Sequence, residues 1–187
     1  MIIDRRYWRL GSISKVYENI SIDLVSQNGI DISENQLTNL EWLPSFIYAF
    51  VARNNKLASL KGSSGCSIPG GFDIRGNRQL HKLDYVPSEI GFGFFCDNCG
   101  IITDASNLFD CEIKGNVYID YQPYLAILPL VKFKSFLVYN QKYNNVGEIL
   151  RKYYNNSYKC NMLALQIDLI KNGFENNARW KPEVFED

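Results

Sequence analysis

A short phrase of apolar and polar positions recurs along the middle of the chain. In its regular form two apolar residues stand two positions apart, and an asparagine follows three positions after the second. The asparagines lie 20, 22, 21 and 18 residues apart, and they are Asn35, Asn55, Asn77, Asn98 and Asn116. A period of about 20 residues is typical of proteins built from stacked coils. The pattern therefore predicts a solenoid.

Each phrase describes one short strand and the turn after it. Phe72 and Ile74 fall on one side of a strand, because side chains alternate across its two faces. Leu80 and Leu83 follow at positions that can return to the same interior. One coil is too small to bury this apolar edge, and stacking buries it continuously. We expect an α/β, or β-rich, leucine-rich-repeat-like solenoid of about five coils with parallel strands over residues 29–120.

The asparagine side chains are predicted to form a column inside the coils. An amide has two N–H donors and a carbonyl acceptor, so it can satisfy backbone groups where the chain leaves a strand. The predicted ladder comprises Asn35, Asn55, Asn77, Asn98 and Asn116. The alternative interpretation is that asparagine is simply frequent in turns.

The same pattern predicts which side chains face outward. Four and two positions before each asparagine lie two columns, one mostly acidic and one mostly basic; the second includes Ser33 and Cys96. We predict that this strand face binds a partner through Asp31, Arg53, Asp73, Arg75, Phe94, Glu112 and Lys114. The alternative is that these charges form ordinary solvated pairs, which contribute only about 0–1 kcal/mol each.

The segments on either side of the repeats are expected to close the solenoid, so that residues 1–187 form a single domain. Residues 1–28 are predicted to be an N-terminal cap, and residues 121–187 an apolar edge segment followed by a helical cap. The stretches 62–71 and 85–91 are rich in glycine, serine and proline and are predicted to be loops.

Two helices are predicted in the C-terminal part. Residues 145–154 place apolar side chains at helical spacing. Residues 161–172 do so with a stripe of Leu163, Ile167 and Ile170, and Gly173 is placed to stop the helix. Met162, Leu165 and Leu169 widen this stripe. These helices can cap the core or serve as a small interaction module.

Charge and hydropathy narrow the classes of function. The chain has 20 basic and 20 acidic residues, which argues against a protein built to hold a nucleic-acid backbone. Arg53, Arg75 and Lys114 leave nucleic-acid recognition as a minor alternative. We find no apolar run near the roughly 20 residues that a membrane helix needs, and no signal-peptide core at the start. We therefore expect no membrane association and a cytoplasmic location.

Candidate chemical groups are few. Five cysteines, an odd number, argue against a disulfide framework, and we expect them to act as small apolar residues. Cys96 and Cys99 have the spacing of half a zinc site, which is a weak signal for metal. His81 lies in a predicted turn. We expect no cofactor and no enzymatic activity; a cysteine-dependent enzyme using Cys96 or Cys99 is the less favoured alternative.

The repeats together with the C-terminal part resemble leucine-rich-repeat-like proteins of bacteriophages and prophages. Those proteins have coils written roughly as Phe-x-Cys-x-x-Asn-x-Leu, then an apolar stretch and two helices. The matching pieces here are 50–60, 72–83, 95–102, 125–136, 146–153, 164–174 and Ala178. The fourth repeat departs from the pattern at 92–95. The resemblance implies a phage or mobile-element context and a host bacterial protein as partner; a self-assembling virion accessory protein is the alternative.

Overall fold

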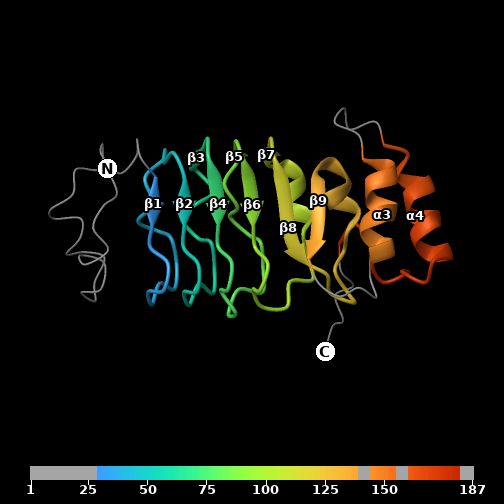
Figure 1. Ribbon diagram of the computed structural model, residues 1–187, viewed down its shortest axis with the longest axis horizontal. Helices are drawn as coiled ribbons and strands as arrows, with labels where there is room; N and C mark the ends of the chain where they lie inside the picture. The colour runs from blue at the N-terminus through green and yellow to red at the C-terminus, as the bar shows by residue number, and fades with distance from the viewer. Residues whose placement is uncertain (1–28, 139–143, 155–159, 182–187) are drawn as a thin grey trace, which may run out of the picture.

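The structure is a computed structural model that describes residues 29–138, 144–154 and 160–181. Parallel strands in stacked coils form a β-solenoid of about four turns, and two helices follow it at the C-terminal end (Figure 1). The predicted solenoid with a helical C-terminal cap is therefore confirmed. The predicted N-terminal cap, 1–28, lies outside the described residues.

One strand from each coil contributes to the larger sheet, which we call sheet A. It has six parallel strands in the order β1-β2-β4-β6-β8-β9. Their bounds are β1 Ile30–Asp31, β2 Phe50–Val51, β4 Gly71–Asp73, β6 Gly93–Phe95, β8 Asn116–Asp120 and β9 Lys134–Val138. Adjacent strands come from neighbouring coils and pair at equivalent positions of the repeat. The side chains at one repeat position therefore form a column across the sheet.

A second sheet, sheet B, was not predicted. Its three parallel strands are β3 Ser67–Ile68, β5 Glu89–Ile90 and β7 Glu112–Ile113. Two of these strands lie in stretches that the sequence pattern assigned to loops. Each has only two residues, with one inward isoleucine, so it leaves no alternating pattern long enough to recognise. The third lies at the start of what was interpreted as the fifth repeat, and the end of that repeat lies in β8 of sheet A.

The core is a set of columns that run from coil to coil. Phe50, Phe72 and Phe94 stack with ring centroids 5.6 Å apart, and none of the three is exposed to solvent. The next inward column is also buried and consists of Ile32, Ala52, Ile74, Cys96 and Ile119. Burying apolar surface stabilises by about 25 cal/mol per Å². Because each ring contacts the equivalent ring above and below, this stabilisation is shared between neighbouring coils.

Helical segments complete the C-terminal part of the structure. A 3-10 helix η2, Ser106–Asp110, precedes β7, and a second, η3, Leu128–Lys132, precedes β9. Helix α3, Asn144–Tyr153, packs against β9, and α4, Met162–Lys171, packs against α3. The side chain of Asn161 caps α4 by accepting from Ala164 N at 3.0 Å.

The segment after α4 returns to the last coil. The backbone N–H groups of Ile127 and Leu128 donate to the carbonyls of Asn177 and Arg179 at 3.1 and 3.3 Å. The Asn177 amide is 1% exposed and donates to the carbonyls of Gln122 and Leu125 at 3.0 and 2.9 Å. An asparagine from outside the repeats thus satisfies backbone groups of the final coil.

Only the widening residues of the apolar stripe predicted for the second helix are buried. Leu165 and Leu169 face the core of the cap and are fully buried. Leu163, Ile167 and Ile170 lie on the opposite side and are 65%, 41% and 45% exposed. Helical periodicity alone gave two candidate faces here, because α4 is apolar on both.

Candidate recognition surface on the strand face

The outward positions of sheet A form a flat surface that we call the strand face. Pairing of the strands aligns Asp31, Val51, Asp73, Phe95 and Tyr118 in one column. Two positions further along each strand, the next outward column consists of Ser33, Arg53, Arg75, Asp97 and Asp120. Each column crosses the solenoid from coil to coil, so groups far apart in sequence become neighbours.

The predicted residues Phe94 and Cys96 do not belong to this face. Both are fully buried, and Phe94 stacks on Phe72. The fourth phrase was aligned on Asn98, which placed it one residue out of register, and a shift of one residue exchanges the two faces of a strand. Phe95 and Asp97 take the outward positions instead.

Asn98 is a turn residue and not part of the ladder. Its φ is 57°, in the left-handed region, and the equivalent turn positions of the preceding coils are Asn54 at 52° and Gly76 at 76°. Asparagine and glycine tolerate this conformation best. The position that corresponds to Asn77 is occupied by Cys99, whose Sγ donates to the carbonyl of Ile74 at 3.4 Å.

Asn116 also lies outside the ladder. It is the first residue of β8, where it pairs with Gly93. Its Nδ2 lies 3.5 Å from the hydroxyl of Tyr118.

The ladder is well formed over the coils in which the asparagine is buried. Asn77 Nδ2 donates to the carbonyls of Ala52 and Ile74 at 2.9 and 2.6 Å, and its Oδ1 accepts from Leu57 N at 3.1 Å. In a similar arrangement Asn55 Nδ2 donates to the carbonyls of Ile32 and Arg53, and its Oδ1 accepts from Leu37 N. Asn35, at the first described coil, donates to the carbonyls of Ile32 and Ser33, both at 2.9 Å. The amides of Asn55 and Asn77 therefore link their coils to the preceding one, whereas Asn35 bonds within its own coil.

Two more predicted residues of the strand face lie on sheet B. Glu112 is aligned with Glu89 across β7 and β5. Lys114 Nζ lies 3.0 Å from Glu89 Oε1 and 3.7 Å from Glu112 Oε1. These residues form an ordinary solvated cluster on a different surface. The prediction failed because the phrase that contains Glu112 and Lys114 was assigned to the wrong sheet.

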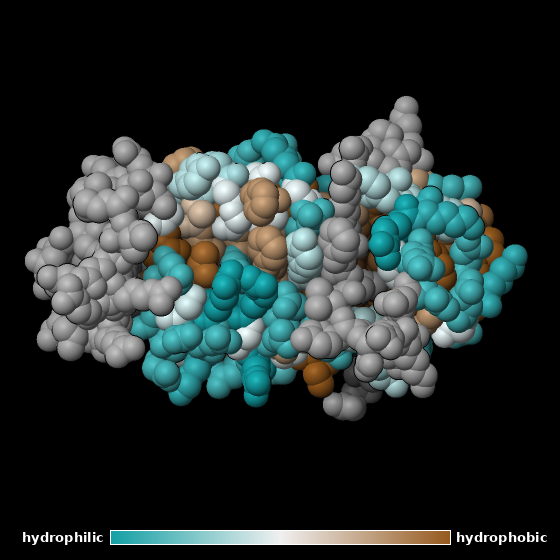
Figure 2. Space-filling view, viewed as in Figure 1, coloured by the Kyte–Doolittle hydropathy of each residue, from teal (hydrophilic) through white to brown (hydrophobic). Residues whose placement is uncertain are grey.

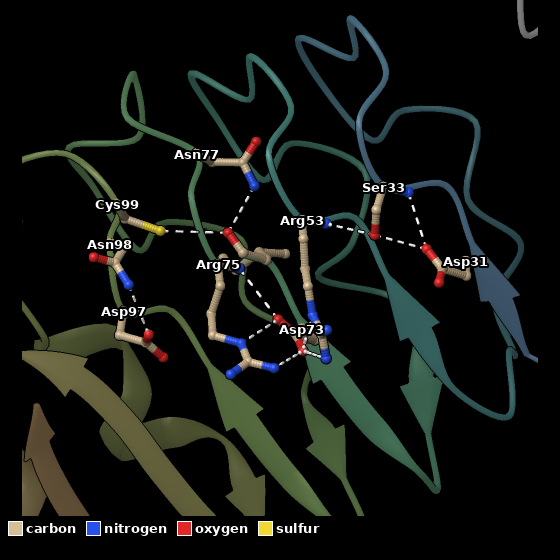
Figure 3. A network of polar contacts seen from close by, with 10 residues as sticks. Asp31, Ser33, Arg53, Asp73, Arg75, Asn77, Asp97, Asn98 and Cys99 are labelled. Atoms are coloured by element: carbon tan, nitrogen blue, oxygen red, sulfur yellow. Dashed lines mark hydrogen bonds and ion pairs between the residues drawn. The ribbon is translucent and has the colours of Figure 1, made fainter. Parts of the chain in front are cut away.

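Asp73 is the centre of the polar cluster on the strand face (Figure 3). Arg53 Nε donates to Asp73 Oδ2 at 2.7 Å, and Arg75 donates through Nε and Nη2 at 2.9 and 2.7 Å. Burial of the Asp73 carboxylate acts to raise its pKa, but the hydrogen bonds from Arg75 and Arg53 outweigh it and hold the pKa below the usual range. One carboxylate thus compensates two guanidinium groups.

Asp31 and Ser33 continue the polar surface at the first coil. Asp31 Oδ1 accepts from the backbone N–H and the hydroxyl of Ser33 at 3.0 and 2.6 Å (Figure 3). The Ser33 hydroxyl in turn accepts from Arg53 N at 3.2 Å. Asp31 is exposed and lies two coils from Asp73.

An aromatic cluster adjoins the arginines. The rings of Phe95 and Tyr118 stack at 4.8 Å, and the Arg75 guanidinium lies 5.3 Å from the Phe95 ring centroid. Phe92 lies 6.5 Å from Phe95 and is 69% exposed. The Phe95 ring lies over Gly93. A Cβ atom added to Gly93 would lie 3.3 Å from Cε2 of Phe95, so the absence of a side chain at Gly93 makes room for the ring. Figure 2 shows apolar side chains gathered over the middle strands, beside a hydrophilic band.

The C-terminal half of the strand face is acidic. Asn98 N donates to Asp120 Oδ2 at 2.6 Å, and Asn98 Nδ2 donates to Asp97 Oδ2 at 3.1 Å. Asp120 Oδ1 is buried and has no hydrogen-bond partner among the residues that the structure describes. Burial raises the pKa of Asp120, the hydrogen bond from Asn98 lowers it, and the Asp97 charge raises it further. Asp97 is 8% exposed, and its charge helps to raise the pKa of the neighbouring Arg75 guanidinium.

Sequence reasoning missed the aromatic and acidic parts of the face. The residues that were not predicted lie in or next to β6 and β8, and they are Phe92, Phe95, Asp97, Tyr118 and Asp120. The sequence feature that could have identified them is the pair of buried apolar positions in each coil. Aligning Phe94 with Phe72 and Cys96 with Ile74 gives the correct register, whereas aligning the asparagines does not.

The thiols lack the properties of nucleophiles. Burial raises the pKa of Cys66 and Cys111 to about 11 and that of Cys99 to about 12, and it raises the pKa of Cys96 well above the usual value. The reactive form of cysteine is the thiolate, so these groups are poorly reactive near neutral pH. Within the described ranges no group of three or more His, Cys, Asp or Glu side chains is arranged to hold a metal ion.

The longest described helices have 10 residues. None of those in residues 29–138, 144–154 and 160–181 is both long and apolar enough to cross a membrane.

Comparison of the chain with protein-family models, with curated proteins and with solved structures gave no match.

Proposed function

We propose that this protein is a non-enzymatic recognition module that binds another protein through the strand face of its solenoid. The carrying observation is the exposed Phe92, which adjoins the stacked rings of Phe95 and Tyr118 and the Arg53–Asp73–Arg75 cluster. Aromatic residues and arginine are the side chains that most often dominate binding energy at protein interfaces.

The arrangement of this surface supports the proposal. Strands are rigid supports, and the buried columns behind them fix the outward side chains in position. Arg75 is held by Asp73 and by the Phe95 ring, so little conformational entropy is lost when it contacts a partner. Aromatic rings likewise supply a large contact area with few rotatable bonds.

The proposal includes an origin and a partner class. The resemblance to repeat proteins of bacteriophages and prophages supports a chain encoded by a mobile element, acting on a host bacterial protein in the cytoplasm.

The test is an affinity capture from bacterial lysate with matched baits. Phe92→Ser removes the exposed ring of the strand face, and Lys114→Glu changes an exposed charge on sheet B as the control. We expect one lysate protein to be retained by the wild type and by Lys114→Glu and to be lost with Phe92→Ser. Equal retention by all three folded baits would contradict a role for the strand face.

A further inference from the structure

The guanidinium groups of Arg53 and Arg75 meet at one carboxylate of the strand face (Figure 3). Asp73 Oδ1 accepts from Arg75 N and Nε at 3.3 and 2.9 Å. Asp73 Oδ2 accepts from Arg75 Nη2 and from Arg53 Nε, both at 2.7 Å, and Arg53 Nη2 lies 2.6 Å from it. A carboxylate has about four lone-pair sites. Both oxygens of Asp73 are therefore fully used, and its side chain is only 6% exposed.

The two guanidinium groups keep donors that Asp73 does not use. A guanidinium has five N–H groups, and each arginine directs only Nε and Nη2 at Asp73. The Nη1 group of each has no acceptor among the residues that the structure describes. The side chains of Arg53 and Arg75 are 47% and 35% exposed, so these donors are open to a partner. At this point the strand face offers donors, and the acceptor beneath them is buried.

The charge at this point suits one negative group. Arg53 and Arg75 carry two positive charges, and the carboxylate that pairs with both supplies one negative charge. Among the described residues Asp97 forms no ion pair with Arg75, but its charge helps to raise the pKa of that guanidinium. The excess positive charge is therefore at most one, and a single carboxylate is enough to neutralise it.

A phosphate group or a nucleic acid fits this charge less well. A phosphate monoester carries about −1.5 to −2 charges at pH 7. A nucleic-acid strand carries one negative charge about every 3.4 Å, whereas the positive stretch covers two strands about 4.8 Å apart. Asp31 is exposed and lies two coils before Asp73, and Asp97 lies one coil after it. Further phosphates would lie next to these carboxylates, so an acidic residue of a protein is the better ligand.

The rings of Phe92 and Phe95 lie beside the arginine pair, next along β4. A Cβ atom added to Gly71 would lie 3.8 Å from Phe92 Cδ1 and 3.5 Å from Phe95 Cε2. Gly71 stands two positions before Asp73 in the same strand, and thus on the same face. Side chains two positions apart on a strand lie about 6.6 Å apart. The exposed ring and the arginine pair therefore have the spacing of two side chains on one face of an extended peptide.

We propose that the strand face binds an extended acidic segment of another protein. A glutamate or aspartate carboxylate of that segment contacts both arginines. One carboxylate can reach both, because the Nη2 atoms of Arg53 and Arg75 each lie within 2.7 Å of the same oxygen of Asp73. An apolar side chain two residues away in the segment packs on Phe92, which is 69% exposed. This inference rests on the proposed function, because it uses the same face, and it names the chemistry of the partner.

The experiment measures binding of the full chain to immobilised peptide mixtures that differ at two fixed positions. The first mixture fixes glutamate and leucine two positions apart, in both orders, and randomises the other positions. The remaining mixtures replace the glutamate by glutamine, lysine or phosphoserine, or place glutamate and leucine next to each other. We expect the first mixture to bind about ten-fold more tightly than the others, because hydrogen bonds between guanidinium and carboxylate groups are strong and side chains of adjacent residues point to opposite faces.

Substitutions in the chain link this preference to the arginine pair. Arg53→Gln leaves Arg75 on Asp73 and should weaken binding of the glutamate mixture about ten-fold, with little change for the glutamine mixture. Lys114→Glu, on sheet B, should behave like the wild type. Raising the ionic strength should weaken binding of the glutamate mixture by the wild type, because salt screens exposed charges.

The outcomes that overturn the inference differ from those that test recognition itself. Binding of none of the mixtures, equal binding of the glutamate and glutamine mixtures, a preference for phosphoserine, or a glutamate preference that persists in Arg53→Gln would each contradict an acidic segment. Capture of a lysate protein that depends on Phe92 would still stand in those cases. If Arg53→Gln does not fold, Arg53→Lys replaces it. Lysine keeps a positive charge beside Asp73 but lacks the Nη1 donors, so it should also weaken binding.

Discussion

The third and fourth coils occupy the same structural positions with different side chains. The third coil presents Ile74 and Asn77 to the interior, and the fourth presents Cys96 and Cys99. Asn77 makes three hydrogen bonds to backbone groups, whereas Cys99 makes one long bond through a weak thiol donor. The coils nevertheless stack in continuous register.

This difference shows what defines a coil. The inward apolar columns continue through both coils, while the asparagine does not. The asparagine therefore strengthens a coil whose path is already set by burial. The two coils also differ outside, since Asp73 and Arg75 form an ion cluster where the next coil places Phe95 and Asp97.

The largest expected effect is at the inward position of the third coil. Ile74→Ala should reduce the free energy of unfolding by about 2–5 kcal/mol, because it leaves a cavity beside Ala52 and Cys96. Cys96→Ala, at the equivalent position of the fourth coil, should cost less because fewer atoms are removed. Chemical denaturation of both variants measures the difference; equal and negligible costs would contradict a shared inward column.

The asparagine position gives a second contrast. Asn77→Ala leaves the carbonyl of Ala52 and the N–H of Leu57 without the hydrogen bonds that the amide makes, and it leaves the Ile74 carbonyl only the weak bond from Cys99. The substitution should cost about 1–3 kcal/mol. Cys99→Ala should cost clearly less, since only one weak bond is lost. If both substitutions left the denaturation midpoint unchanged, the ladder would have no role in stability.

Asp73 makes the outer surface of the third coil sensitive to pH. Because the folded-state pKa is lowered, its ionised form stabilises the fold above the unfolded value of about 3.9, and this contribution is lost as pH falls through the folded pKa. Asp73→Asn should cost about 2 kcal/mol at neutral pH. The gap between the two unfolding curves should narrow below about pH 4; a gap that is constant with pH would exclude the charge as its cause.

The smallest effect is expected from converting the fourth coil to the pattern of the third. Cys99→Asn places an amide next to the carbonyl of Ile74, and should change stability by at most about 1 kcal/mol, in the stabilising direction. Thermal unfolding with Cys99→Ala as the reference measures it. Strong destabilisation would show that the two positions are not equivalent.

How much of the fold and of the strand face the sequence predicts differs from coil to coil. In the first three coils the apolar pair and the asparagine agree, so the register and the outward residues Asp31, Arg53, Asp73 and Arg75 were predictable. In the fourth coil four adjacent aromatic or glycine positions, 92–95, allow either register. Aligning the phrase on Asn98 selects the wrong register, because a turn position also favours asparagine.

Sheet B and the orientation of α4 were not predictable by periodicity. Two-residue strands are too short to show alternation, and a helix that is apolar on both sides does not reveal which side is covered. Asn177, which serves the last coil, lies outside every repeat and acts through tertiary contact alone.

The central claim is that Phe95 and Asp97 face outward and Cys96 faces inward, because the strand face and both proposals depend on this register. Native-state alkylation of the full chain, followed by peptide mapping, tests it directly. The structure predicts that Cys160, which is only partly buried, reacts first, while Cys96 is protected until the protein unfolds. Labelling of Cys96 as fast as Cys160 in the folded protein would place Cys96 on the outer face and contradict the account.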